Sequence, residues 1–128
     1  MIKQFKVALI LSAAVLILIG CFPASLFAAQ KGIASWYSKT GPGIKKYTAS
    51  GEVFDDRKLT CASRSYKFGT RLRVKNLKNG KSVVCRVNDR GPHKRLVCRK
   101  IDLSKAAFRR IADDRIGLIR VSITKISE

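Results

Sequence analysis

The chain has 128 residues, of which 46% are apolar, and it carries 27 lysines and arginines against 8 acidic residues. This length and composition allow one compact core and exclude a second domain of ordinary size. A formal net charge of +19 favours polyanionic partners. Because no helix-turn-helix, zinc-finger or RNA-binding motif accompanies the charge, we do not expect a nucleic-acid partner.

The N-terminus has the pattern of an export signal. Lys3 and Lys6 precede an uncharged apolar run over residues 7–19, which is typical of a signal segment. We therefore predict that residues 1–29 are a signal peptide or lipoprotein signal and that residues 30–128 form the exported domain. That domain would meet cell-wall glycan, phosphate-bearing envelope polymers and anionic lipid headgroups as its polyanions.

The sequence leaves open three ways in which this segment is processed or retained. Cleavage near Ala28 or Ala29 gives a soluble periplasmic or secreted protein. Residues 18–21, which read LIGC, resemble a bacterial lipobox, in which case Cys21 is lipidated and ties the domain to the membrane. An uncleaved membrane anchor is the third fate, and Pro23 with its small neighbours disfavours it. In each case the expected location is the cell envelope or the exterior.

The exported domain has a β-rich pattern. Residues 70–75 read TRLRVK, so Leu72 and Val74 share one face of a half-buried strand. Similar strands are expected at residues 34–37, 81–88 and 118–126. Between two of these strands, Asn79-Gly80 supplies the positive backbone angles of a tight hairpin turn.

One short helix is expected near the end of the chain. Ser104 is a good N-cap residue, and the following KAAFRRIA places Ala107, Phe108 and Ile111 on one face. Short strands with a single short helix predict a closed or nearly closed barrel, because so small a sheet needs its edges paired.

Three cysteines follow Cys21, namely Cys61, Cys85 and Cys98. An oxidising compartment permits one disulfide among them, and the sequence leaves all three pairings open. Adding His93 would complete a set of four zinc ligands, but the close C-x2-C spacing of structural zinc sites is missing. We therefore expect a disulfide and no metal site.

Five motifs occur in a characteristic order and spacing. They are ASWY (residues 34–37), TASGEVFD (48–55), FGTRLRV (68–74), NGKSVVCRVNDRGP (79–92) and KIDLSKAA (100–107). Together they resemble the rare lipoprotein A family, RlpA, from residue 32 to residue 126. The resemblance implies a six-stranded double-psi β-barrel, related in architecture to expansins and barwin.

The resemblance also implies an activity, endolytic lytic transglycosylation of peptidoglycan with a preference for glycan stripped of stem peptides, and no cofactor. Many relatives carry a carboxy-terminal peptidoglycan-binding repeat domain that has no counterpart before Glu128. Recruitment to septal glycan through such a domain is therefore not expected.

Lytic cleavage of this kind needs only one well-placed carboxyl, because the C6 hydroxyl of muramic acid attacks its own anomeric carbon. The resemblance places Glu52 at a catalytic acidic position, Asp55 at the neighbouring acidic position, and Asp89 at the acid that double-psi barrels hold in their groove. We expect Asp56 at the surface. We interpret Asp102 as a helix-start or core hydrogen-bonding residue rather than a catalyst.

Four further residues lie near the predicted site. Three of them have two alternative roles, and the fourth is expected to take no part in the chemistry. Trp36 and Tyr37 either stack on sugar rings or belong to the core. Arg90 either holds Asp89 in place or binds a glycan carboxylate through its planar donors. His93, in the loop after Gly91-Pro92, is expected to be exposed and uninvolved.

One departure from the family pattern concerns the acid-base chemistry. Family members commonly read TAAH where this chain reads TCAS at residues 60–63, so Ser63 replaces a histidine. Serine can donate a hydrogen bond to a sugar or a carboxylate, but it cannot exchange protons near neutral pH. Two functions therefore stay open, a glycan-cleaving enzyme and an expansin-like protein that binds or loosens wall glycan without cutting it.

Overall fold

The computed structural model describes residues 28–128. The predicted signal segment and the lipidation site at Cys21 fall almost entirely on residues 1–27 and lie outside the described residues. Between residues 28 and 128, no helix is long and apolar enough to cross a membrane.

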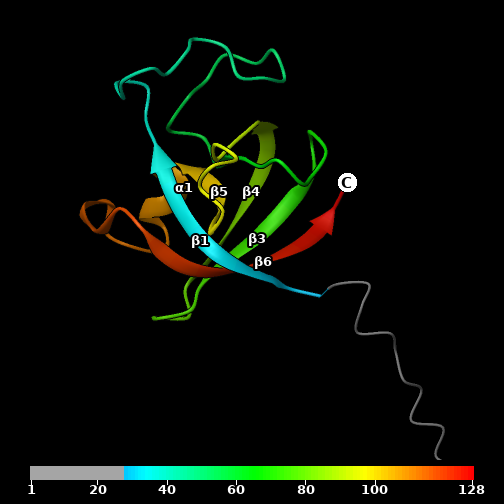
Figure 1. Ribbon diagram of the computed structural model, residues 1–128, viewed down its shortest axis with the longest axis vertical. Helices are drawn as coiled ribbons and strands as arrows, with labels where there is room; N and C mark the ends of the chain where they lie inside the picture. The colour runs from blue at the N-terminus through cyan, green and yellow to red at the C-terminus, as the bar shows by residue number, and fades with distance from the viewer. Residues whose placement is uncertain (1–27) are drawn as a thin grey trace, which may run out of the picture.

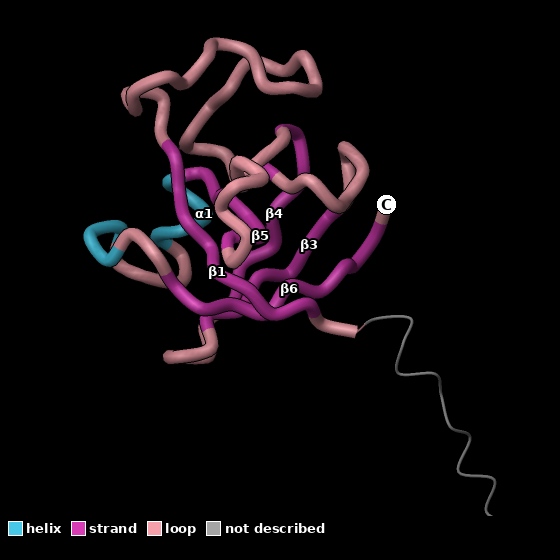
Figure 2. The backbone as a smooth tube through the Cα atoms, viewed as in Figure 1, coloured by secondary structure: helices cyan, strands magenta, loops and turns pink. Residues whose placement is uncertain are grey.

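Six strands form a closed barrel in the order β1-β5-β2-β4-β3-β6 (Figures 1 and 2). The elements are β1 Gln30–Tyr37, β2 Thr60–Ala62, β3 Arg71–Asn76, β4 Ser82–Asp89, β5 Arg99–Ser104, α1 Lys105–Arg109, the 3₁₀ helix η2 Asp114–Ile116, and β6 Ile119–Ser127. The pairs β1–β5 and β2–β4 are parallel, and the other neighbouring pairs are antiparallel. This confirms the double-psi β-barrel that the motifs implied.

The barrel interior follows from the alternation of apolar residues along the strands. In β3, Leu72 and Val74 are fully buried while the basic residues between them are exposed, as the period of two requires. Phe108 and Ile111, from the helix and the turn after it, close one side of this core. Closure leaves no sheet edge unpaired, so the small sheet is protected from edge-to-edge association.

The turn between β3 and β4 differs from the expected tight hairpin turn with positive backbone angles at Asn79-Gly80. Asn76 N–H donates to the carbonyl of Lys81, and Gly80 N–H donates to the carbonyl of Asn76, so four residues lie between the closing pair. Only Gly80 has a positive φ, of 75°. The prediction was wrong about Asn79, whose side chain instead reaches the carbonyl of Ile111 at 2.9 Å.

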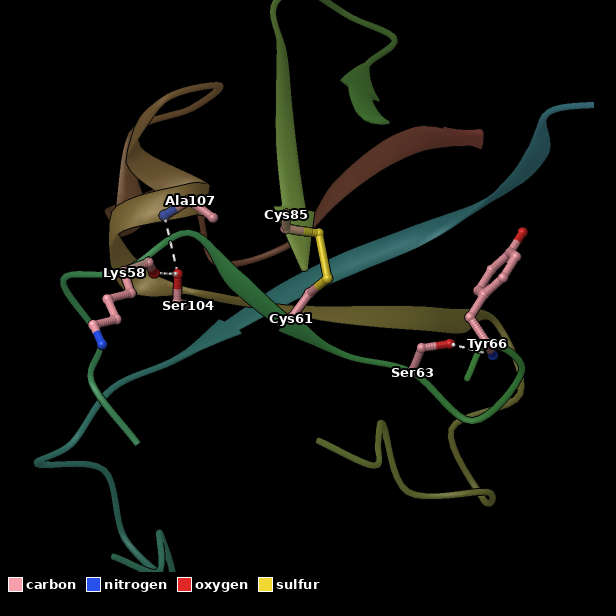
Figure 3. The surroundings of a disulfide bond; sticks show 7 residues. All are labelled: Lys58, Cys61, Ser63, Tyr66, Cys85, Ser104 and Ala107. Atoms are coloured by element: carbon pink, nitrogen blue, oxygen red, sulfur yellow. Dashed lines mark hydrogen bonds between the residues drawn. A yellow bond between two sulfur atoms is a disulfide. The ribbon is translucent and has the colours of Figure 1, made fainter. Parts of the chain in front are cut away.

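The predicted helix is present but short. The Ser104 side chain accepts a hydrogen bond from Ala107 N–H at 3.2 Å, which confirms the N-cap, and its hydroxyl donates to the Lys58 carbonyl at 2.6 Å (Figure 3). α1 ends at Arg109 and a turn continues to Ile111. The cap therefore fixes both the helix and the segment that leads into β2.

The disulfide joins Cys61 of β2 to Cys85 of β4, with the two Cα atoms 5.8 Å apart (Figure 3). Both residues are buried in the core. Cys98 is exposed and is the free cysteine among residues 28–128. The pairing that the sequence left open is thus Cys61 with Cys85.

Candidate functional site

Strand register brings four residues into one row across the barrel. Ser35 of β1 lies opposite Asp102 of β5, Asp102 lies opposite Ala62 of β2, and Ala62 lies opposite Asp89 of β4. Residues paired in this way point to the same face of a sheet. The small Ala62 separates the two aspartates, so this part of the surface forms a shallow floor with one carboxyl on each side.

A groove lies above this floor. Its volume is about 420 Å³, and it is lined by Tyr37, Gly43, Ile44, Lys45, Tyr47, Thr48, Ala49, Phe54, Ala62, Asp89, Arg90 and Asp102. The loop after β1, which supplies residues 43–49, extends beyond the end of the barrel at the top of Figure 1. Phe54 is buried and stacks on Tyr37 with ring centroids 4.5 Å apart, so the aromatic pair connects the loop to the floor.

Asp102 is the most enclosed carboxyl of the groove. Burial raises its pKa, while the hydrogen bond from the Ser35 hydroxyl acts in the opposite direction and the charge of Asp89 adds to the increase. Gly91 lies against it, because a Cβ at that position would come 3.0 Å from Asp102 Oδ2. Asp102 therefore does not start the helix. It accepts a hydrogen bond between two strands, as one of the sequence interpretations expected, and it also lines the groove from β5.

Asp89 is held by the backbone. Its Oδ1 accepts hydrogen bonds from Ala49 N–H at 2.9 Å and from Arg90 N–H at 2.8 Å. These bonds fasten the loop that contains Ala49 to the end of β4. Asp89 thus combines the turn-shaping role and the groove position expected from the sequence.

The charges of both carboxyls, Asp89 and Asp102, act on the hydroxyl of Tyr37. Burial raises the pKa of its hydroxyl, and the charges of Asp89 and then Asp102 and a hydrogen bond toward Asp89 raise it further. The hydroxyl oxygen is buried, and its approach to Asp89 does not meet strict hydrogen-bond geometry. A ligand in the groove can complete the hydrogen bonding of a buried donor whose nearby acceptor is poorly aligned.

Glu52 lies outside the groove lining. Arg86 donates to both of its oxygens, at 2.6 and 2.8 Å, and Asn88 adds a longer bond at 3.3 Å. The Arg86 hydrogen bonds lower the pKa of Glu52 to about 2. Glu52 is therefore ionised at neutral pH and cannot donate a proton in this arrangement.

Asp55 and Asp56 are also not among the residues that line the groove. Arg57 donates to both oxygens of Asp55, at 3.1 and 3.2 Å, and lowers the pKa of that carboxyl to about 2. Asp56 accepts a hydrogen bond from Lys39 N–H at 2.9 Å. Both carboxylates thus stabilise turns around the loop.

Ser63 and Arg90 organise the segment between β2 and β3. The Ser63 side chain is buried and its hydroxyl accepts from the N–H groups of Ser65 and Tyr66 (Figure 3). Arg90 Nη1 donates to the carbonyls of Ser63 and Tyr66, and its guanidinium lies 3.8 Å from the centroid of the Phe68 ring. Arg90 also lines the groove, and these two carbonyls engage its Nη1.

The neighbours Trp36 and Tyr37 separate, since successive strand residues point to opposite faces. Trp36 packs against Phe108, with ring centroids 6.5 Å apart, and its Nε1 donates to the carbonyl of Asp114 at 2.8 Å. Trp36 is therefore structural, whereas Tyr37 lines the groove together with Tyr47 and Phe54. His93 is exposed, as predicted.

The comparisons with known proteins agree with this fold. Residues 29–123 match the family model described as lytic transglycolase. A probable endolytic peptidoglycan transglycosylase RlpA from Synechocystis is 50% identical over 93 residues, which are 72% of this chain and 27% of the relative. The endolytic peptidoglycan transglycosylase RlpA of Pseudomonas aeruginosa is 42% identical over 95 residues, 74% of this chain and 27% of the relative. The chain thus spans less than one third of the length of these relatives.

Solved structures with the same barrel include a papain inhibitor from Streptomyces, with a TM-score of 0.62 and 21% identity over 77% of this chain and 94% of the inhibitor. An expansin of Clavibacter michiganensis has a TM-score of 0.59 and 29% identity over 79% of this chain and 52% of the expansin. A mutant of a Clavibacter michiganensis expansin in complex with cellohexaose has a TM-score of 0.60 and 26% identity, covering 77% of this chain and 50% of that one. The family match and the closed six-stranded barrel confirm the resemblance read from the motifs, and this chain belongs to the lytic transglycolase family.

Proposed function

We propose that this chain is a lytic transglycosylase that cleaves the glycan strands of peptidoglycan and leaves 1,6-anhydromuramic ends. The observation that carries the proposal is the partly buried carboxyl of Asp102 on the groove floor, with its raised pKa and with Asp89 one small residue away in the same row. A general acid must be protonated near its working pH, and burial is the usual means of achieving this for a carboxyl. The names of the relatives support peptidoglycan as the substrate.

In the proposed reaction, protonated Asp102 donates its proton to the glycosidic oxygen as the bond from that oxygen to the anomeric carbon breaks. The C6 hydroxyl of the same muramic acid then attacks the anomeric carbon and closes the 1,6-anhydro ring. Asp102, now a carboxylate, accepts the hydroxyl proton and returns to its starting form. No water is consumed, so one carboxyl serves both steps.

The other groove residues have supporting roles in this proposal. Asp89 supplies a fixed negative charge close to the positive charge that develops on the sugar ring. Tyr37 offers its hydroxyl, which lies beside Asp89, to the substrate. Glycan without stem peptides exposes a lactyl carboxylate on each muramic acid, and Lys45 lines the groove, so we propose that stripped glycan is preferred.

Glu52 enters the proposal as a positioning residue. Its carboxylate is bound to Arg86 and Asn88 of β4, and its carbonyl accepts from Thr48 N–H at 2.8 Å. These bonds hold the loop that carries groove residues 48 and 49. Glu52 would become the acid, with Asp55 beside it, only if substrate displaced Arg86.

The test is digestion of purified peptidoglycan, with and without stem peptides, followed by mass spectrometry of the released glycans. We expect 1,6-anhydromuramic ends, released faster from stripped glycan. Products with free reducing ends would indicate hydrolysis and contradict the mechanism. Loss of soluble products with wall binding intact would favour the binding function instead.

Matched variants assign the acid. Asp102→Asn keeps the size of the side chain and is expected to lower the rate about 10²–10⁴-fold while binding to insoluble peptidoglycan persists. Glu52→Gln is expected to have a smaller effect that appears mainly in KM. Asp113→Asn, at a solvent-exposed turn, is the control. A larger kcat loss for Glu52→Gln than for Asp102→Asn would transfer the acid role to Glu52.

An expansin-like binding function is the second candidate. It is favoured by the Clavibacter michiganensis expansin relatives, one of them in complex with cellohexaose, and by Ser63, whose hydroxyl is occupied by backbone donors. In that case the groove binds glycan without cleaving it. Asp102→Asn would then change the affinity for glycan, and neither the natural chain nor the variant would release cleavage products.

The cellular setting is part of the same proposal. We infer that the domain acts in the cell envelope, that residues 1–29 direct export, and that its basic surface binds anionic envelope polymers. Metabolic labelling with palmitate, compared between the natural chain and Cys21→Ala, tests the lipoprotein fate. Absence of label with the protein present outside the cytoplasm would favour the cleaved soluble form.

A further inference from the structure

A group of exposed apolar side chains lies away from the groove lining. Leu77, Val97, Ile116 and Leu118 have exposed fractions of 45%, 70%, 60% and 44%, and we call them the basal patch. Leu77 belongs to the β3–β4 turn, which lies at the bottom of Figure 1, whereas the loop that borders the groove extends beyond the top. The proposed function does not use this surface.

The basal patch is continuous. One open hollow, of about 750 Å³, is lined by residues that include Leu77, Ile116, Leu118 and Arg120. A second, of about 630 Å³, includes Leu77, Val97 and Arg120. Because Leu77 and Arg120 belong to both hollows, the four apolar side chains form one surface rather than isolated exposures.

Basic side chains surround this apolar surface. Lys78 and Arg120 line the first hollow, and Lys31 and Lys100 line the second with Arg120. The lining of the two hollows contains a single acidic residue, Asp113, which belongs to the first hollow. Arg115 forms an ion pair with it at 2.6 Å. An apolar centre with a cationic border is complementary to an anionic lipid surface, where apolar side chains enter the interface and cations meet the headgroups.

The position of the chain entry supports the same partner. β1 begins at Gln30, and its next two residues, Lys31 and Gly32, line the second hollow. The sequence before β1 has no charged residue between Lys6 and Lys31 and is apolar over residues 7–19. The segment that would enter or approach a bilayer is therefore joined to the barrel beside the basal patch.

We propose that the basal patch docks on the surface of an anionic phospholipid bilayer. Val97 and Ile116, the most exposed of its apolar side chains, enter the interface, while Lys31, Lys100 and Arg120 contact lipid phosphates. The β3–β4 turn then faces the lipid and the loop over the groove faces away from it. The chain is thereby held with its groove open toward the wall rather than tumbling at the end of a tether.

Cys98 provides a native probe, because it is exposed and lines the second hollow. The full chain, with Cys21→Ser so that no other free thiol competes, is labelled at Cys98 with an environment-sensitive fluorophore and reconstituted into vesicles. We expect a blue shift and quenching by headgroup-labelled quencher lipids in phosphatidylcholine with about 30% phosphatidylglycerol, and neither in phosphatidylcholine alone. About 0.5 M NaCl should reverse the effect.

Charge-matched variants make the result specific. Lys31→Glu with Lys100→Glu should weaken docking at least about 25-fold, since each basic side chain near an anionic surface contributes about fivefold. Lys39→Glu with Lys67→Glu carries the same net charge change but lies beyond the end of β1 and before the start of β3, and should leave docking unchanged. Val97→Ser with Ile116→Ser should remove the blue shift while the folded barrel persists.

Three outcomes would overturn the proposal. The first is equal fluorescence in neutral and anionic vesicles. The second is an equal response from a label at Thr40→Cys in a Cys21→Ser, Cys98→Ser background, which would show that no particular face meets the lipid. The third is a response in neutral vesicles that grows with protein density, which would identify the partner as a second copy of the chain.

Discussion

Ser35 and Asp102 are paired residues on the neighbouring parallel strands β1 and β5, and the Ser35 hydroxyl donates a hydrogen bond to Asp102 Oδ1. The hydroxyl favours the ionised carboxyl, whereas burial favours the protonated one and is the larger effect, so the pKa of Asp102 is raised. This pair keeps a carboxyl in place on the groove floor, where the charge of Arg99 lowers its pKa only in part and burial remains the larger effect.

The first prediction concerns the pH dependence of stability at Asp102. Because its folded pKa is raised above the unfolded value, protons bind the folded state more tightly, and the contribution of Asp102 to stability falls as pH rises through the folded pKa. Asp102→Asn should therefore have a similar Tm to the natural chain near pH 3 and a higher Tm near pH 7. Thermal melts by circular dichroism across that range measure the difference.

Asp55→Asn supplies a control of opposite sign. Its folded pKa is lowered to about 2, so its contribution is present above the unfolded value and is lost as pH falls through the folded value. This variant should lose stability near pH 7 and match the natural chain near pH 2. A Tm difference for Asp102→Asn that shrinks as pH rises would contradict the raised pKa.

The second prediction concerns the disulfide between β2 and β4. Cys61 and Cys85 are 24 positions apart, and closing a loop of this length stabilises a fold by about 3 kcal/mol. Replacing both by alanine should lower the free energy of unfolding by at least that amount, because both sulfurs are also buried in the core. Denaturant titration measures it, and Cys98→Ser, at an exposed position, should change it by less than about 0.5 kcal/mol.

The third prediction concerns Arg90. Its guanidinium stacks on Phe68 and bridges the carbonyls of Ser63 and Tyr66, and a lysine cannot reproduce that planar geometry. Arg90→Lys should lower the free energy of unfolding by about 1–2 kcal/mol. It should also increase hydrogen exchange at residues 63–68. Arg71→Lys, on the exposed face of β3, should do neither, and equal effects of the two variants would show that only charge matters.

The strands that alternate clearly could be predicted from the sequence, whereas β1, which does not alternate, was predicted only at its last four residues. Exposed and buried residues alternate strictly along β3, and β4 and β6 largely show the same alternation. β2 is buried at all three positions, and β5 has a mixed pattern. Neither strand has an alternation of apolar and polar residues that would predict it. Only the family resemblance, which implied six strands, led us to expect them.

The groove was harder to predict than the strands. Asp102 lies two residues before the helix cap, so a local reading joins it to the helix, yet its partner Ser35 is 67 positions away across a parallel pair. Pairing over such distances is set by the topology of the whole barrel rather than by neighbouring residues. The family motif pointed to Glu52, and no spacing in the sequence indicates that Arg86 of β4 binds its carboxylate.

The last prediction concerns the Tyr37 hydroxyl, which is buried and has no partner in strict hydrogen-bond geometry among residues 28–128. Because the Asp89 carboxylate beside this hydroxyl is not in good hydrogen-bond geometry, little net stability depends on the contact, and Tyr37→Phe should change the free energy of unfolding by less than about 1 kcal/mol. The hydroxyl lies near Asp89 and Asp102, where a bound sugar would supply a well-aligned partner. The same variant should therefore bind stripped glycan about tenfold more weakly, since a lost hydrogen bond of this kind is worth about 1–1.5 kcal/mol.

Tyr66→Phe, outside the groove lining, is the matched control for both measurements. Denaturant titration and co-sedimentation with insoluble glycan separate the two effects. Larger destabilisation by Tyr37→Phe would mean that the hydroxyl has a well-aligned partner in the free protein. Unchanged glycan binding with unchanged stability would remove Tyr37 from the substrate contacts and leave its ring, stacked on Phe54, as a support for the loop.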